Sequence, residues 1–524
     1  MKRVVSTIIG TMLLVMVLAP SSTREGAAAP LNVPKGKVVI GVQSLQSESP
    51  DPNGQIGGSD QLQLDLIYDR IVCTDMEGKQ NPAFGVLSSW KMDNDGLSWV
   101  FQIHKGIKFH NGDPLTAEDV KFSFDRLAKS NSNQAPRLKL TFDSVEVIDP
   151  YTVRVRLKRP NARLMTGDLW SLWVVPKRYI ERVGDEYFSQ HPIGSGPYKF
   201  VSMKRGEYME FEAFDDYWRG SPYVKTVRLE IVPELSTRLA KLKTGEIDIM
   251  TSVQPHMIPE IKATKGLRTM SAKETCKMQL QPGRWWSHLD TVWGAALSKV
   301  DVRQALNIAI DRRAIVQTLF LGEATPAAAF VDRGSYGADP TLKAYPYDPK
   351  KAKELLAKAG YPNGFEVNVY AANFPAISGI METAEIVQRQ WADIGVRMKI
   401  IQLDVGTLLK RLGTDQIDGF HIAGTTFSLD AWFLFSMHDV STSPYTAYGD
   451  PAFDKKVAAA AAMLDPVKSD EAVKELDRYI YNNYVHIPIV YGNTIYGVND
   501  RVAEWPLARG SGLPRDLNLL KLKD

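Results

Sequence analysis

Three things are scarce in this chain of 524 residues: cysteine, net charge and long apolar runs. Lysine and arginine together number 63 and aspartate and glutamate 60, so the formal net charge is only +3. A nearly neutral protein with interspersed charges lacks the basic surface of a nucleic-acid-binding protein. We therefore expect no nucleic acid among its partners.

Cys73 and Cys276 are the only two cysteines. Neither closely follows the apolar run near the N-terminus, so the sequence offers no lipid-attachment site. In an oxidising compartment the two thiols would pair if their Cα atoms lay within about 7 Å of each other. Two separate buried thiols are the alternative, and the sequence leaves both open.

The one long apolar run lies at the N-terminus. Lys2 and Arg3 precede the apolar stretch Ile8–Ala19, and the small residues Ala27–Ala29 follow it. This is the layout of a secretory signal peptide, and about 12 apolar residues are fewer than the ~20 of a membrane-spanning helix. We expect residues 1–29 to be a cleaved signal peptide and the mature protein to be soluble and periplasmic; a retained anchor helix is the alternative.

Familiar catalytic motifs are also missing. The sequence has no G-x-S-x-G, H-E-x-x-H, P-loop or G-x-G-x-x-G pattern, and Gly194–Tyr198 is better explained as a turn into a strand than as a phosphate loop. We therefore expect a protein that is not an enzyme, with no catalytic residue, metal or cofactor. A secreted α/β hydrolase stays open as an alternative function.

What the sequence does contain is an alternation of helices and strands. Asp348 followed by Pro349 predicts the start of a helix that ends at Gly360, and a strand is expected over 365–371. A second helix over 382–394 and a strand over 396–403 follow, and a helix pair over 302–321 restarts at Asp311. Such alternation is typical of βαβ units and a largely parallel sheet, so the predicted fold class is α/β.

One local design occurs twice, far apart in the chain. A helix over 236–244 ends at Gly245 before a strand over 247–250, and a helix over 407–412 ends at Gly413 before a strand over 417–422. Together with a length that suggests two or three domains, this indicates two α/β lobes. Ligands of open α/β sheets bind outside the carboxyl ends of the strands, so two facing lobes predict a cleft between them.

Aromatic residues mark two candidate walls of such a cleft. Arg284, Trp285, Trp286 and His288 lie in a polar segment flanked by proline and glycine, where indole rings can stack on a ligand and an arginine can pair with an anion. Phe427 and Trp432 follow the strand predicted over 420–424 and so lie near its carboxyl end. Packing inside the protein explains both groups equally well.

Five blocks of the sequence, taken together, resemble one known family. They are, in order, residues 95–120 (with GIKFHNG and LTAEDV), 192–200 (PIGSGPYKF), 233–250, 302–312 (VRQALNIAIDR) and 347–364 (YDPKKAKELLAKAGYPNG). The chain is similar to the bacterial extracellular solute-binding proteins of family 5, the peptide/nickel-type receptors of ABC importers.

The resemblance implies a two-lobed periplasmic-binding-protein fold with a hinge, of the large three-domain peptide-receptor type. The expected domains are a discontinuous first domain (31–70, 191–275 and 493–524), an inserted second domain (71–190) and a third domain (276–492), with hinge strands near 270–276 and 490–496. The implied partners are a small-molecule or peptide ligand and an ABC permease in the inner membrane, and the expected state is a monomer. A ligand-sensing partner of a membrane receptor is a further alternative.

The chain departs from the family where dipeptide receptors hold the peptide termini. By the resemblance, an aspartate and an arginine of those receptors correspond to positions near Phe427 and Phe374 here. A buried ammonium or carboxylate without its counter-ion would cost several kcal/mol, so a zwitterionic dipeptide is disfavoured. We expect a longer peptide, an opine-like or aromatic compound, or a small glycoside. The candidate polar contacts are Arg284, His288 and Asp430, and the candidate walls are Trp285, Trp286, Phe374, Phe427 and Trp432.

Overall fold

The computed structural model describes residues 33–523, except residues 46, 55–59, 133–134, 170–171, 373–377, 427, 429 and 444. The predicted signal peptide therefore lies outside the described residues. Within them, no helix is both long enough and apolar enough to span a bilayer.

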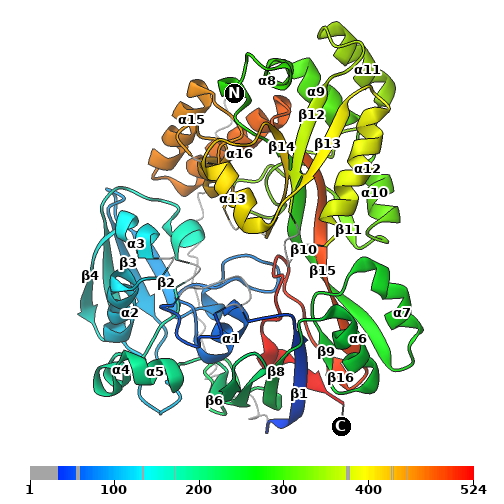
Figure 1. Ribbon diagram of the computed structural model, residues 1–524. Helices are drawn as coiled ribbons and strands as arrows, with labels where there is room; N and C mark the ends of the chain where they lie inside the picture. The colour runs from blue at the N-terminus through cyan, green and yellow to red at the C-terminus, as the bar shows by residue number, and fades with distance from the viewer. Residues whose placement is uncertain are drawn as a thin grey trace, which may run out of the picture.

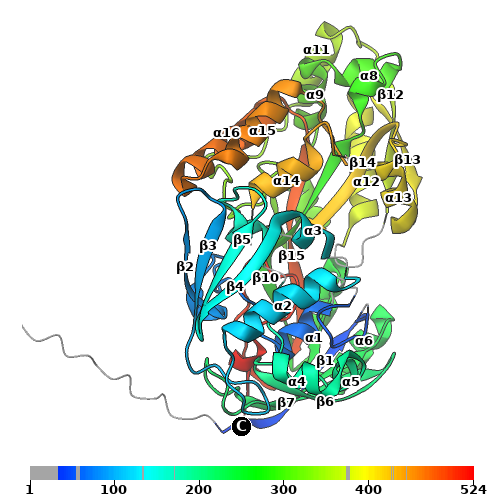
Figure 2. The same cartoon turned by 90° about the vertical axis from the view of Figure 1, so that its left-hand side faces the viewer.

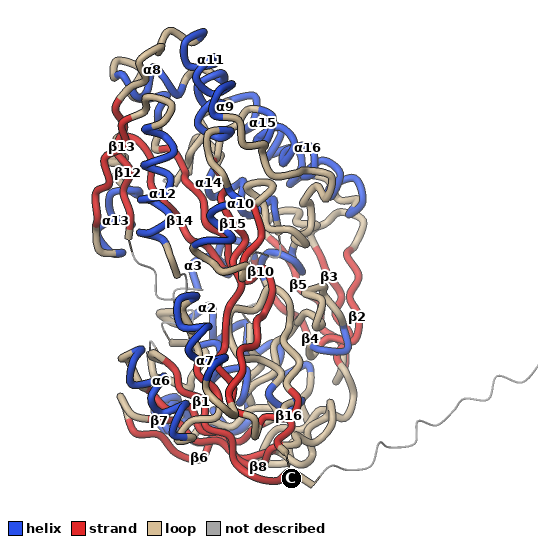
Figure 3. The backbone as a smooth tube through the Cα atoms, turned by 90° about the vertical axis from the view of Figure 1, so that its right-hand side faces the viewer, coloured by secondary structure: helices blue, strands red, loops and turns tan. Residues whose placement is uncertain are grey.

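Two long strands connect the two lobes of the molecule (Figure 1). β10 (Leu267–Pro282) and β15 (Ile487–Asn499) run antiparallel from Leu267 opposite Asn499 to Leu280 opposite Ile487. Both strands pass from one lobe to the other (Figure 3). Their register shifts between Ala272, which belongs to the core of the lower lobe, and Cys276, which packs against the core of the upper lobe. These strands include both predicted hinge segments, and the two-lobed α/β fold is confirmed.

A single 11-stranded sheet extends through both lobes because β10 and β15 belong to both. Its order is β13-β12-β14-β10-β15-β9-β1-β8-β7-β6, with β11 paired to β15 outside this path. The strands on the β13 side form the upper lobe of Figure 1 and those on the β6 side form the lower lobe.

The lower lobe packs helices against its half of the sheet. Its apolar core includes Val38, Ile40, Phe211 and Leu229, which are fully buried. The elements of this lobe are β1 (Lys35–Val42), α1 (Asp60–Ile67), β6 (Tyr198–Lys204), β7 (Tyr208–Ala213), β8 (Val224–Ile231), α6 (Leu235–Thr244), β9 (Ile249–Met250), α7 (Ile258–Ala263), β16 (Val502–Glu504) and β17 (Lys521–Leu522).

A smaller subdomain with its own four-stranded sheet lies beside the lower lobe (Figure 2). The strand order is β2-β3-β5-β4, all antiparallel. Helix α2 of this subdomain begins with a capping box between Thr116 and Asp119. Its elements, with the two helices that join it to the lobe, are β2 (Leu87–Met92), β3 (Ser98–Ile103), α2 (Ala117–Lys129), α3 (Ala135–Thr141), β4 (Phe142–Asp149), β5 (Thr152–Leu157), α4 (Lys177–Val183) and α5 (Asp185–Gln190).

The upper lobe holds most of the helices that the sequence predicts. Asp348 accepts a hydrogen bond from the Lys351 N–H at the start of α11, and Asp311 accepts one from the Ala314 N–H at the start of α10. The elements of this lobe are α8 (Val292–Leu297), α9 (Val300–Ile308), α10 (Arg312–Thr318), β11 (Ala324–Pro326), α11 (Pro349–Lys358), β12 (Glu366–Ala371), α12 (Ile380–Ala392), β13 (Arg397–Gln402), α13 (Val405–Gly413), β14 (Gly419–Thr426), α14 (Ala431–His438), α15 (Pro451–Ala462) and α16 (Pro466–Asn482).

Gly194–Tyr198 forms a turn into β6, as predicted. A Cβ atom at Gly194 would lie 2.1 Å from the carbonyl oxygen of Ile67, and one at Gly196 would lie 2.6 Å from the carbonyl carbon of the same residue. The two glycines therefore allow this turn to pack directly on the backbone at the end of α1. Their role is close packing rather than phosphate binding.

Candidate ligand-binding site

Parallel strands of both lobes point their carboxyl ends at the boundary between the lobes. In the upper lobe β14 is parallel to β12, and its last residue, Thr426, lies opposite Cys276 where β10 crosses between the lobes. In the lower lobe β1 is parallel to β8 and β9, and Met250 at the end of β9 lies opposite Gly497 of β15. Because ligands of α/β sheets bind beyond such ends, the interlobe boundary is the candidate ligand-binding region.

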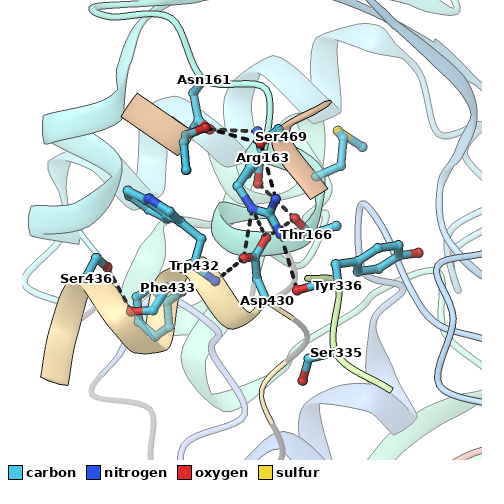
Figure 4. A network of polar contacts seen from close by, with 12 residues as sticks. Asn161, Arg163, Thr166, Ser335, Tyr336, Asp430, Trp432, Phe433, Ser436 and Ser469 are labelled. Carbon is cyan, nitrogen blue, oxygen red and sulfur yellow. Dashed lines mark hydrogen bonds and ion pairs between the residues drawn. The ribbon is translucent and has the colours of Figure 1, made fainter. Parts of the chain in front are cut away.

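A buried ion pair spans this boundary (Figure 4). Arg163, in the loop after β5 of the small subdomain, directs its Nε at both carboxylate oxygens of Asp430, at 2.9 and 2.8 Å. Asp430 is the N-cap of α14 in the upper lobe. The Arg163 side chain is 9% exposed and that of Asp430 is 1% exposed, so both charges lie away from bulk water.

Further polar contacts complete this network. Arg163 also donates to the Ser469 hydroxyl of α16 and to the Tyr336 carbonyl oxygen, each at 3.3 Å. Thr166, one turn after Arg163, donates its hydroxyl to Asp430. The Gln80 N–H of the small subdomain donates to the Tyr336 hydroxyl at 3.3 Å. The small subdomain and the upper lobe are therefore in direct contact through hydrogen bonds that several segments share.

The polar side-chain atoms of Asp430 and Trp432 already form hydrogen bonds within the protein. Asp430 accepts from Arg163, from Thr166 and from the Trp432 N–H, and the indole N–H of Trp432 donates to the Val457 carbonyl oxygen at 3.0 Å. A ligand that binds Asp430 would have to displace one of these donors. The geometry therefore supports a role in joining the lobes more directly than a role in ligand contact.

The segment from Arg284 to His288 follows the end of β10, beyond Pro282. Arg284 donates to the Ser443 carbonyl oxygen at 2.9 Å, and His288 lies 3.8 Å from Asp415. Trp285 packs against two of the apolar clusters of the upper lobe. Its ring meets that of Trp286 edge-to-face.

This segment and Asp430 lie at opposite ends of the β10–β14 ladder. Pro282 lies opposite Phe420 at one end, and Cys276 lies opposite Thr426 at the other. Six residues of strand separate the two ends, which is about 20 Å. The structure therefore does not bring Arg284, Trp285, Trp286 and His288 together with Asp430. Phe374 and Phe427 lie outside the described residues.

Sequence reasoning missed a buried charge pair near the end of β14. Lys277 of β10 is 1% exposed and donates to the Phe330 carbonyl oxygen at 2.5 Å, with Asp332 at 3.5 Å. Asp332 also accepts a hydrogen bond from the Ser428 N–H at 3.1 Å. Burial lowers the pKa of Lys277 and raises the pKa of Asp332, and each charge opposes the shift of the other. The alternation of polar and apolar residues from Lys277 to Gln281 indicates a strand with a polar face, but nothing in it indicates that this face is buried.

Metal and disulfide chemistry find little support in the described part of the chain. Cys73 and Cys276 are both free, and Arg515 donates to the Cys73 Sγ at 3.5 Å. Among the described residues, no three His, Cys, Asp or Glu side chains are grouped so that they would hold a metal ion.

Comparison with known proteins identifies the family to which this chain belongs. The profile described as bacterial extracellular solute-binding proteins, family 5, middle, matches residues 81–451. The chain belongs to this family. The dipeptide-binding protein of Escherichia coli K12 is 30% identical to this solute-binding protein over 472 residues, which cover 83% of this chain and 85% of the relative.

Two solved structures share the fold of this solute-binding protein. The ABC transporter substrate-binding protein CtaP of Listeria monocytogenes has a TM-score of 0.82 at 24% identity and covers 94% of this chain and 100% of its own. MoaA of A. tumefaciens R10 was solved in complex with mannopinic acid. It has a TM-score of 0.70 at 23% identity, and the match covers 94% of this chain and 100% of MoaA. These relatives are binding proteins and lend no support to a hydrolase.

Proposed function

We propose that this protein is the substrate-binding component of an ABC importer, which captures a small solute between its lobes and delivers it to a membrane permease. The observation that carries the proposal is the arrangement of the sheet. Parallel strands of both lobes end at the interlobe boundary, and β10 and β15 connect the lobes there. Such a pair of connecting strands permits the lobes to close around a ligand, and closure changes the surface that a permease meets.

The proposed ligand is less zwitterionic than a dipeptide. Phe374 follows β12 and Phe427 follows β14 in the sequence, where we infer that dipeptide receptors carry charged residues. A longer peptide, an opine-like or aromatic compound, or a small glycoside fits these apolar side chains better. The mannopinic acid bound to MoaA shows that a structure with this fold takes an opine. Phe374, Phe427 and Trp432 are the proposed walls, whereas the position of Arg284 to His288 supports a packing role.

The proposed organisation follows the family. Residues 1–29 would be removed as a signal peptide, and a monomer without a lipid anchor would act in the periplasm. The proposed domains are 31–70 with 191–275 and 493–524, then 71–190, and then 276–492. The ion pair of Arg163 with Asp430 would join the second and third of these domains.

A thermal-shift panel tests the proposed function. The panel contains dipeptides, peptides of three to five residues, opines including mannopinic acid, aromatic acids and small glycosides, each added to protein that has been unfolded and refolded to remove bound solute. A ligand at 100 times its dissociation constant adds about 2.7 kcal/mol to the free energy of unfolding, which gives a clear rise in Tm. We expect a rise with one class other than dipeptides. A rise with dipeptides alone would refute the proposed specificity, and no rise with any class would refute the function.

A further inference from the structure

One face of the upper-lobe sheet carries polar side chains where a core is normally apolar. On β10, Lys277, Gln279 and Gln281 point to this face, and Met278 and Leu280 point to the opposite, apolar one. On β14, Thr425 lies opposite Lys277 and His421 lies opposite Gln281, so both share the polar face. We call Lys277, Gln279, Gln281, His421, Thr425 and His486, which directly precedes β15, the polar stripe.

The polar stripe is covered rather than exposed to solvent. Gln279 and Gln281 are each 1% exposed, and His421 is 4% exposed. The end of α14 meets the stripe at His486, where Asp439 accepts from the His486 Nε2–H at 2.7 Å. The ring of Phe330 stacks on His486 with centroids 3.9 Å apart and meets His438 edge-on. The stripe is therefore an interior surface of the lobe.

Many polar atoms of this interior surface have no partner in the described part of the protein. Both polar atoms of the Gln279 carboxamide are unpaired, and so is the amide nitrogen of Gln281. The others are Nδ1 of His421, His438 and His486, Oγ1 of Thr425 and Oδ2 of Asp439. Buried polar groups in folded proteins are nearly always hydrogen-bonded, so a group of eight unpaired atoms in one place indicates that a polar molecule belongs beside them.

The unpaired atoms define the chemistry of that molecule. The Nε2 atoms of His421 and His486 face the oxygens of Gln281 and Asp439, so these Nε2 atoms carry the hydrogen and the two Nδ1 atoms are acceptors. The Gln279 carboxamide and the Gln281 nitrogen add donors and a further acceptor. Hydroxyl groups both donate and accept, which suits this mixture. Asp332 already neutralises Lys277, and burial raises the pKa of Asp439 and so favours its neutral form; a neutral group therefore fits better than a charged one.

The stripe begins at the proposed ligand-binding region. Thr425 is the penultimate residue of β14, whose carboxyl end meets the interlobe boundary. Lys277 lies near the same end, because its ammonium group donates to Asp332, and Asp332 accepts from the N–H of Ser428, just beyond β14. From Thr425 the stripe extends to His421, four residues of strand or about 13 Å into the lobe. We propose that the polar stripe is a subsite of the interlobe site and takes a neutral, hydroxyl-bearing chain of the solute. This proposal rests on the proposed function.

Two probes and two variants test this subsite. D-gluconamide and hexanamide are neutral amides of equal chain length that differ only in their hydroxyl groups. We expect D-gluconamide, and not hexanamide, to bind the refolded wild-type protein in ligand-observed NMR and to raise its Tm. In the double variant Gln279→Met and Gln281→Met, gluconamide binding should weaken about tenfold or more, because several hydrogen bonds are lost. The matched control Gln388→Met, on α12 against the opposite face of the sheet, should bind gluconamide like the wild type.

The stability of the single variant Gln279→Met gives a second readout, because both polar atoms of Gln279 are unpaired whereas the Gln281 oxygen pairs with His421. Replacing unpaired buried polar groups by apolar groups of similar shape is expected to leave the urea midpoint unchanged or higher. A clearly lower midpoint for Gln279→Met would mean that Gln279 is paired within the protein, and it would overturn the proposal. Hexanamide binding equal to that of gluconamide, no gluconamide binding, or unchanged binding by the double variant would also overturn it. In each case a positive result in the solute panel would leave the proposed function standing.

Discussion

Arg163 and Asp430 are 267 positions apart in the chain, and their buried ion pair joins the small subdomain to the upper lobe. The guanidinium also reaches Ser469 and Tyr336, and the carboxylate also caps α14. Two segments distant in sequence thus share one closely packed polar network at the boundary where a solute is proposed to bind.

Removing one charge of this pair should destabilise the protein strongly. Arg163→Met leaves the Asp430 carboxylate buried without its cation, and we expect a loss of about 3–5 kcal/mol in the free energy of unfolding, measured by urea denaturation. The double variant with Asp430→Asn keeps a helix cap and removes the uncompensated charge, so it should recover part of this loss.

The control for this prediction is a surface ion pair of the upper lobe. Arg397 and Glu366 are 63% and 77% exposed, so Arg397→Met should cost about 1 kcal/mol or less. If Arg163→Met proved no more costly than Arg397→Met, the Arg163–Asp430 pair would not bind the two parts of the molecule together.

His421 should make stability depend on pH. Burial, with a smaller contribution from His486, lowers the pKa of His421 from 6.5 to about 3. Between these pH values the unfolded chain binds a proton that the folded protein does not, so His421 lowers the free energy of unfolding as the pH falls from 6.5 towards 3. In His421→Gln this contribution is absent. Relative to that variant, the wild type should lose up to about 1.4 kcal/mol per pH unit over this range.

The measurement compares urea denaturation of the two proteins from pH 7 to pH 4. Taking the difference between them cancels the titration of other buried groups, such as Asp69, whose pKa burial raises to about 6. Parallel curves for wild type and His421→Gln would show that His421 does not stay neutral inside the lobe.

The turn at Gly194 should tolerate no side chain. A Cβ atom there would lie 2.1 Å from the backbone oxygen of Ile67, so Gly194→Ala must move α1 or the turn, and we expect a loss of about 1–3 kcal/mol. At Gly413, the last residue of α13, no heavy atom lies within 4 Å of the added Cβ. Gly413→Ala should therefore be neutral or slightly stabilising, and equal thermal stability of both variants would speak against the described packing.

Trp285 distinguishes a packing role from a ligand contact. Its ring packs on two apolar clusters and lies tilted against Tyr448, so Trp285→Ala should reduce the free energy of unfolding by about 3 kcal/mol. Calorimetric titration with the solute that the panel identifies should give an unchanged affinity, because Trp285 lies beyond the far end of β10. A tenfold loss of affinity in the Arg284→Ala and Trp285→Ala double variant would instead support the contact expected from sequence.

Local chemistry explains what could be predicted from the sequence. Asp311 and Asp348 cap helices through hydrogen bonds only three residues along the chain, so their positions are visible in the sequence. The Arg163–Asp430 pair has no such local signal, because its partners meet only after the lobes assemble. The alternation from Lys277 to Gln281 predicts a strand with a solvent-exposed polar face, whereas helix α14 and the loop at Phe330 cover that face.

Native mass spectrometry of the refolded protein, incubated with the same solute panel, tests the central claim most directly. We expect one compound to be retained at a ratio of one to one and to be released with its mass unchanged. Retention of no compound, or release of a hydrolysed product, would contradict a solute-binding function.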